Sequence, residues 1–111
     1  MSSPYPSDPD LLKAVLVPLL EDFQYWFGRS VQLLESEKIP FFSIQEQQDL
    51  LQKIQEAKSQ VSAAQALSAA TQNQAAIDMS LVMAWHQLVQ ECWQVAVRFR
   101  QETQASPQRN N

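Results

Sequence analysis

The chain is poor in the residues that make turns and cross-links. Its 111 residues include one glycine, Gly28, and one cysteine, Cys92. A single cysteine excludes an internal disulfide and a cysteine-based metal cage within one chain, and it suits a reducing compartment. The scarcity of glycine removes the residue that tight turns most often need, so the composition favours long helices.

Long apolar runs and an excess of positive charge are also missing. The longest uninterrupted apolar run, AVLVPLL at 14–20, is far shorter than the ~20 residues that a membrane-spanning helix needs. The N-terminal MSSPYPSDPD lacks the basic and apolar segments of a secretory signal. A net charge of −4 argues against binding to nucleic acid or anionic membranes, because both attract clustered lysine and arginine. We therefore expect a cytoplasmic protein with no nucleic-acid partner and no membrane span.

The residues that are present suit one helical domain. Hydrophobic residues make up 45% of the sequence and aromatic residues 9%, which is too apolar for a disordered chain and enough to bury a core. Glutamine is the most abundant residue, and helices tolerate its straight side chain well. These features predict an all-α fold.

Capping residues and prolines mark the first predicted helix. In DPDLL, Asp8 can cap a helix whose first residue is Pro9. The helix should end near Glu37, because Pro40 forces the residue before it out of the α-helical region. Pro18 lies inside this span, where it removes one backbone hydrogen bond, and it predicts a kink. A short first helix followed by a longer one is the alternative.

Two more helices complete the predicted fold. The motif SIQE places Ser43 and Glu46 as a capping box, in which each side chain accepts a hydrogen bond from the backbone amide of the other residue. The segment 71–78 contains Asn73 and Asp78, residue types that cap helices or form turns, so we expect the connection there. The third helix should begin within 78–81 and end near Glu102.

The predicted architecture is an up-down-up three-helix bundle with long helices, the first one kinked at Pro18. It forms a single helical domain at 9–102, preceded by a flexible N-terminal segment at 1–8. The residues at 103–111 have almost nothing to bury, so we expect them to be a disordered C-terminal tail.

The first helix combines a core stripe with an aromatic residue outside it. The stripe lies within about 60° of Phe23 on a helical wheel and comprises Leu12, Leu16, Leu19, Leu20, Phe23, Trp26, Phe27, Ser30 and Leu34. Tyr25 points about 200° away from Phe23, and Arg29 follows one turn later. A glycine inside a helix lowers the stability of the helix relative to alanine, so Gly28 suggests a notch that permits close approach of another backbone. The resulting candidate protein-binding face comprises Tyr25, Gly28, Arg29, Glu21 and Gln32. A single exposed tyrosine without a function is the alternative.

The third helix presents a wide apolar arc. Its main stripe comprises Leu81, Trp85, Leu88, Val89, Cys92, Ala96 and Phe99, and an edge ridge comprises His86, Trp93, Val97 and Arg100. Packing in or beside the core is the simpler interpretation, because each helix of a three-helix bundle faces two neighbours. The alternative is a small-ligand or tetrapyrrole site, with His86 as axial ligand or polar anchor and Trp85 or Trp93 stacked on the planar ligand.

Motifs that carry catalysis are absent from the sequence. There is no glycine-rich phosphate loop, no metal-ligand spacing and no set of serine, histidine and acid that the sequence places together. Cys92 lies among apolar residues, where burial raises the pKa of a thiol and keeps it inert. We therefore expect a protein that is not an enzyme and needs no cofactor and no metal.

Two blocks, LLEDFQYWFGRSVQLLESE at 19–37 and WHQLVQECWQVAVRFRQE at 85–102, resemble a small cyanobacterial family, the domain of unknown function 2605. The resemblance spans about residues 10–102. The family has no established activity, so the resemblance implies no mechanism. It implies a photosynthetic cell and, from that setting, an accessory role around photosynthetic or carbon-fixing machinery.

The leading functional hypothesis is a non-enzymatic protein-protein interaction or assembly module. It would hold a partner protein through the face around Tyr25 or through the edge of the third helix. The sequence leaves the partner open and is compatible with a homo-oligomer. The alternative function is the small-ligand or tetrapyrrole-binding bundle.

Overall fold

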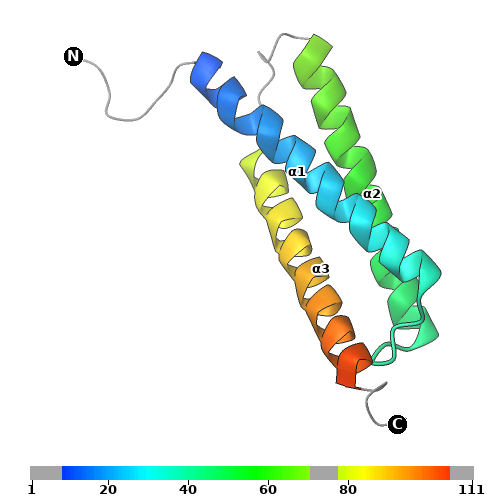
Figure 1. Ribbon diagram of the computed structural model, residues 1–111. Coiled ribbons are helices and arrows are strands. Elements are labelled where there is room, and N and C mark those ends of the chain that lie inside the picture. Colours follow the sequence, from blue (N-terminus) through cyan, green and yellow to red (C-terminus); the bar gives the residue numbers. More distant parts are fainter. Residues whose placement is uncertain (1–8, 71–77, 106–111) are drawn as a thin grey trace.

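Three long helices make up the part of the chain that the structure, a computed structural model, describes: residues 9–70 and 78–105 (Figure 1). They are α1 at Pro9–Ser36, α2 at Ile44–Ala70 and α3 at Met79–Ala105. The helices alternate in direction, and no strand occurs within the two described segments. The expected all-α three-helix bundle is confirmed. None of these helices combines the length and the apolar character needed to cross a membrane.

Helix α1 runs without interruption through Pro18 and ends at Ser36. The alternative of a short helix followed by a longer one is therefore wrong. A proline inside a helix removes one backbone hydrogen bond, and a bend at this point stays a prediction. The expectations for 1–8, 71–77 and 106–111 lie outside the described residues.

Helix α3 extends to Ala105, beyond its expected end at Glu102. The first residues of the segment 103–111 are therefore helical and not disordered. Arg98 Nε donates a hydrogen bond to Glu102 Oε2 at 2.8 Å, and such an ion pair between residues i and i+4 stabilises a helix. The Arg98 guanidinium also lies 4.0 Å from the centre of the Phe41 ring, which ties the end of α3 to the connection between α1 and α2.

The starts of α2 and α3 are capped by the expected residues. Ser43 Oγ accepts a hydrogen bond from the Glu46 amide at 3.0 Å, and Glu46 Oε1 accepts one from the Ser43 amide at 2.8 Å, so the capping box is confirmed. At the start of α3, the Asp78 carboxylate accepts hydrogen bonds from the hydroxyl and the amide of Ser80, at 2.7 and 2.9 Å. These two bonds hold the pKa of Asp78 below its ordinary value.

A buried glutamine joins α1 to α2. Gln47 lies in the first turn of α2, and its Nε2 donates to the carbonyls of Leu34 at 2.8 Å and Glu37 at 2.7 Å. Its Oε1 accepts a hydrogen bond from the Ile39 amide at 2.9 Å. The last carbonyls of a helix have no partner within that helix, so this side chain satisfies groups that the end of α1 leaves open. We call this set of hydrogen bonds the Gln47 clamp.

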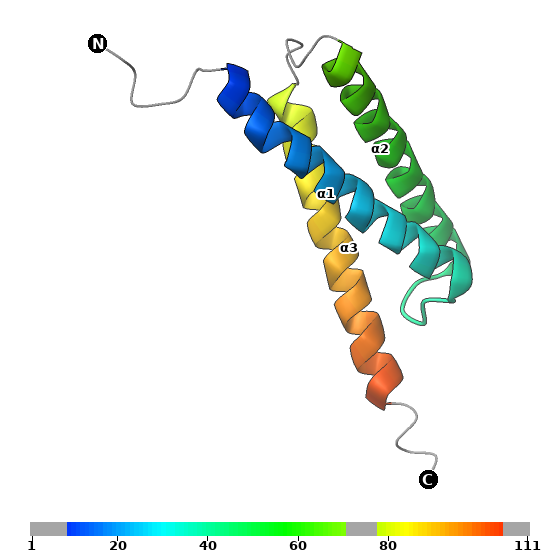
Figure 2. The same cartoon turned by 45° about the horizontal axis from the view of Figure 1, so that its top comes forward.

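The core lies where α1 packs against both other helices (Figures 1 and 2). Phe23 and Phe27 of α1 and Val61 of α2 are almost fully buried. The Phe23 ring meets the Trp85 ring of α3 edge to face, with 5.8 Å between centroids. Trp85 Nε1 donates a hydrogen bond to Gln60 Oε1 of α2 at 3.1 Å. Trp85 therefore contacts α1 and α2 at once.

The expected core stripes need correction at their margins. Leu81 is 39% exposed, and the buried stripe of α3 instead includes Val82 and Val95. Trp26 is only partly buried and packs at the edge of the core. A helical wheel gives the direction of a side chain but not how far the neighbouring helix reaches, so residues at the margin of a stripe are the ones it misplaces.

We expect Gln47→Ala to lower the free energy of unfolding by about 1–3 kcal/mol, because it leaves the Ile39 amide and the carbonyls of Leu34 and Glu37 without their buried partner. Gln48 is the adjacent glutamine and is exposed, so Gln48→Ala is a matched control that should change stability by no more than about 0.5 kcal/mol. Urea titration measures both variants. Equal losses would show that the clamp does not stabilise the fold.

Stability should also depend on Asp78 at acidic pH. Because its pKa is lowered in the folded state, its stabilising effect is present above the ordinary aspartate pKa of about 4 and is lost as the pH falls through the lower folded-state value. Asp78→Asn keeps a capping side chain but does not titrate. The thermal midpoint of this variant should fall less than that of the wild type between about pH 5 and pH 2. Circular dichroism melts at several pH values test this, and parallel curves would contradict it.

Candidate docking groove

Tyr25 lies on the outside of α1, as its position on the helical wheel predicts, and is 54% exposed. Arg29, one turn later, donates a hydrogen bond from Nη1 to the Tyr25 hydroxyl at 3.0 Å, and its guanidinium lies 5.8 Å from the centre of the Tyr25 ring. Glu21 and Gln32 of the same candidate face are exposed as well. The structure thus joins Tyr25 and Arg29 into one exposed pair.

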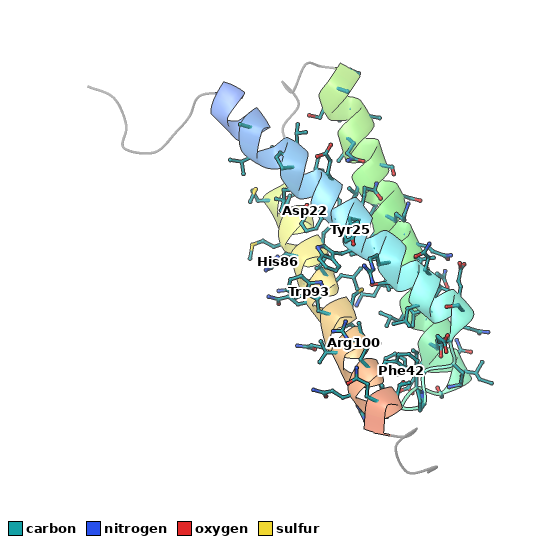
Figure 3. The ribbon with its side chains drawn as sticks, viewed as in Figure 1. Asp22, Tyr25, Phe42, His86, Trp93 and Arg100 are labelled. Atoms are coloured by element: carbon teal, nitrogen blue, oxygen red, sulfur yellow. The ribbon has the colours of Figure 1, made fainter. Side chains whose placement is uncertain are left out.

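The Tyr25 face continues onto α3 through a row of aromatic rings. The Tyr25 and Trp26 rings meet edge to face at 4.9 Å between centroids, and Trp26 meets Trp93 of α3 in the same manner at 5.2 Å. Trp93 is 49% exposed and lies on the side of α3 next to α1 (Figure 3). We call Tyr25, Trp26 and Trp93 the aromatic row. Tyr25 and Trp93, which the sequence assigned to two separate candidate surfaces, are therefore connected through Trp26.

Beside the aromatic row, α1 and α3 enclose an open groove with a volume of about 480 Å³. We call it the α1–α3 groove; it is lined by Trp26, Arg29, Leu33, Trp93, Val97, Phe99 and Arg100, together with the smaller Ser30, Cys92 and Ala96. Most of this lining is apolar, and the two arginines come from different helices. Leu33 belonged to no predicted set, because it lies at the margin of the α1 stripe.

Helix α2 packs on the other flank of α1, away from the groove. Gln24, on that flank, donates hydrogen bonds from Nε2 to Ser62 Oγ at 2.7 Å and to the Lys58 carbonyl at 3.2 Å. Gly28 lies on the same flank, where a Cβ atom would stand 3.8 Å from Lys58 Cε. A partner backbone approaching Gly28 would have to displace the Lys58 side chain. The structure therefore places Gly28 beside α2 and apart from the groove.

The two arginines of the groove lack the ion pairs that Lys53 and Arg98 form within the described segments. Lys53 pairs with Glu91 at 3.5 Å, and Arg98 pairs with Glu102. Within residues 14–70 and 78–104, neither Arg29 nor Arg100 forms an ion pair. The hydrogen bond from Arg29 to the neutral Tyr25 hydroxyl leaves the charge of the guanidinium uncompensated.

Cys92 is the thiol in the lining of the groove. Its side chain is buried against Ser30, and burial raises the pKa of the thiol, which a hydrogen bond with Ser30 opposes only in part. A thiol with a raised pKa is mostly protonated at neutral pH and is a poor nucleophile. Burial therefore disfavours thiol chemistry at Cys92.

The residues of the alternative ligand site do not come together. The Trp85 ring is 2% exposed and lies between the helices, so a planar ligand has no access to it. His86 lines a different hollow on the surface, and its Nε2 lies 3.3 Å from Gln90 Nε2. Trp93 follows His86 by about 10 Å along the helix axis, at 1.5 Å per residue. This arrangement gives the pigment-binding hypothesis no support.

We expect Gly28→Ala to raise the free energy of unfolding by about 0.5–1 kcal/mol, because alanine favours a helix interior and its Cβ makes only an ordinary contact with Lys58. Chemical denaturation measures the change. A loss of stability would mean that the glycine is needed for packing of α1 against α2.

A comparison with protein families finds a match over residues 6–101 to the family described as protein of unknown function (DUF2605). No curated protein and no solved structure matches the chain.

Proposed function

The chain belongs to the DUF2605 family, and we propose that it is a non-enzymatic interaction module that holds a partner protein in the α1–α3 groove. The observation that carries this proposal is the exposure of Trp93. This ring packs on Trp26 yet remains 49% exposed, at the edge of a groove with a largely apolar lining. Exposed apolar surface of this kind is typical of protein interaction sites.

The residue types of the surface support the same proposal. Tryptophan, tyrosine and arginine contribute most of the binding energy in many interfaces, and all three meet here in Tyr25, Arg29 and Trp93. Arg29 and Tyr25 are held to each other by a hydrogen bond, which limits the side-chain entropy lost on binding. The surface is thus partly ordered before a partner arrives.

We further propose an accessory or assembly role in the cytoplasm of a cyanobacterial cell, around its photosynthetic or carbon-fixing machinery. The support for this setting is the sequence resemblance alone. The proposal that the groove binds a protein is supported by the groove itself and does not depend on this cellular setting.

A photo-crosslinking amino acid at Val97, inside the groove, tests the proposed function in native cells. We expect it to capture a specific polypeptide, which mass spectrometry identifies and which is then purified for binding measurements. The same crosslinker at the exposed Gln52 of α2 is the control, since Gln52 lies on another helix and outside the groove. Capture of identical proteins from both positions would contradict docking in the groove.

With that purified partner, Trp93→Ala should raise the dissociation constant by about tenfold or more, as expected for a residue that contributes about 2 kcal/mol to binding. Met83→Ala is the matched control, because Met83 is an exposed apolar residue of the same helix outside the groove. It should leave the affinity within about twofold. Isothermal titration calorimetry measures both, and an unchanged affinity of the Trp93 variant would refute the proposal.

A further inference from the structure

We infer that the occupant of the α1–α3 groove is an amphipathic helix of a partner protein, with two acidic residues about one turn apart that pair with Arg29 and Arg100. This inference rests on the proposed function and specifies the chemistry of the partner.

The helical form of the occupant follows from the arrangement of the bundle. Helices α1 and α3 run in the same direction on either side of the groove, and α2 covers the other flank of α1 (Figures 1 and 2). A helix in the groove would contact α1 and α3 from the open side and complete a four-helix arrangement. A partner segment added as a β-strand would need a free sheet edge, and the described segments contain no strand.

The apolar lining determines the apolar face of this helix. Leu33 and Trp26 line the α1 side, and Trp93, Val97 and Phe99 line the α3 side. A helix presents an apolar stripe to such a groove through residues at i, i+3 or i+4, and i+7. The partner helix should therefore carry leucine, isoleucine or aromatic residues at this spacing.

The charge of the groove determines the polar residues of the partner. Although the chain as a whole has a net charge of −4, the charged side chains that line the groove are both arginines, Arg29 and Arg100. No carboxylate in the described part of the chain pairs with either of them. Arginine binds carboxylates through charge-assisted hydrogen bonds, so acidic residues on the partner complement this surface.

The positions of the two arginines set the spacing of the acids. At 1.5 Å per residue, Arg29 lies about 4.5 Å beyond Trp26 along α1, and Arg100 lies about 10.5 Å beyond Trp93 along α3. Trp26 and Trp93 contact each other and so mark one level of the bundle. The two arginines are then offset by about 6 Å, close to the 5.4 Å pitch of an α-helix. Because Arg29 and Arg100 belong to different helices, the two acids should lie about one turn apart along the partner helix, one on each flank of its apolar stripe.

The test is a selection from a library of displayed amphipathic helical peptides against the full chain. We expect the wild type to enrich peptides with an apolar stripe and two acids one turn apart. The Arg29→Glu/Arg100→Glu double variant should enrich lysine or arginine at those two positions. The control is the Lys53→Glu/Lys58→Glu double variant, which changes the net charge by the same amount but at positions on α2. It should select the same acidic peptides as the wild type.

Fluorescence anisotropy with one selected peptide then measures the pairing. Its dissociation constant should rise about tenfold or more for the Arg29→Glu/Arg100→Glu variant, and a peptide whose two acids are replaced by lysine should recover most of that loss. Enrichment of apolar peptides without acids, or no effect of the charge reversal, would overturn the inference and leave the docking function intact. Failure of the Val97 crosslinker to capture a polypeptide would instead refute the docking function itself.

Two further measurements test the choice of occupant. Sedimentation should find a monomer near 12.7 kDa at micromolar concentration. A dimer that the Arg29→Glu/Arg100→Glu variant dissociates would show that the occupant is a second copy of this chain. Binding to vesicles of anionic phospholipid that the same variant abolishes would identify a membrane surface, and either result would overturn the inference.

Discussion

The packing of Trp85 against Phe23 determines where the rest of α3 lies. The indole meets Phe23 of α1 edge to face and donates to Gln60 of α2, so two helices fix the rotation of the third. Trp93 follows eight residues later and is turned by about 80° from Trp85, because each residue of an α-helix advances by about 100°. That rotation carries Trp93 out of the core to the flank, where it meets Trp26. The groove is thus a consequence of how the core is packed.

The features of the fold that sequence could predict are those set by neighbours in the chain. The capping box at Ser43 and the cap at Asp78 involve residues two or three positions apart, and both helices begin where these residues place them. Gln47 was missed because its partners lie across a connection and because glutamine is usually exposed. The end of α3 was predicted too early. Its last turns are stabilised by the ion pair of Arg98 with Glu102 and by the contact of Arg98 with the Phe41 ring, and the polar composition of the tail gives no sign of these contacts.

The same distinction applies to the candidate site. The direction of Tyr25 follows from helical geometry, so its exposure was predictable from a wheel of one helix. The contact of Trp26 with Trp93 and the cover that Lys58 provides for Gly28 depend on how two helices are placed relative to each other. A single sequence contains no direct signal for the relative placement of two helices. The exposed residues could therefore be predicted from the sequence, but not that residues of α1 and α3 together line one groove.

The Gln47 clamp has a consequence for the order in which the chain folds. It joins groups only 8 to 13 residues apart, so little chain entropy is lost when it forms. The contact of Phe23 with Trp85 closes a much longer loop, and contacts between distant residues form more slowly. The hairpin of α1 and α2 should therefore assemble first, and α3 should dock onto it. During synthesis on the ribosome, the hairpin would form while α3 is still being made, and Phe23 would stay uncovered until the last helix emerges.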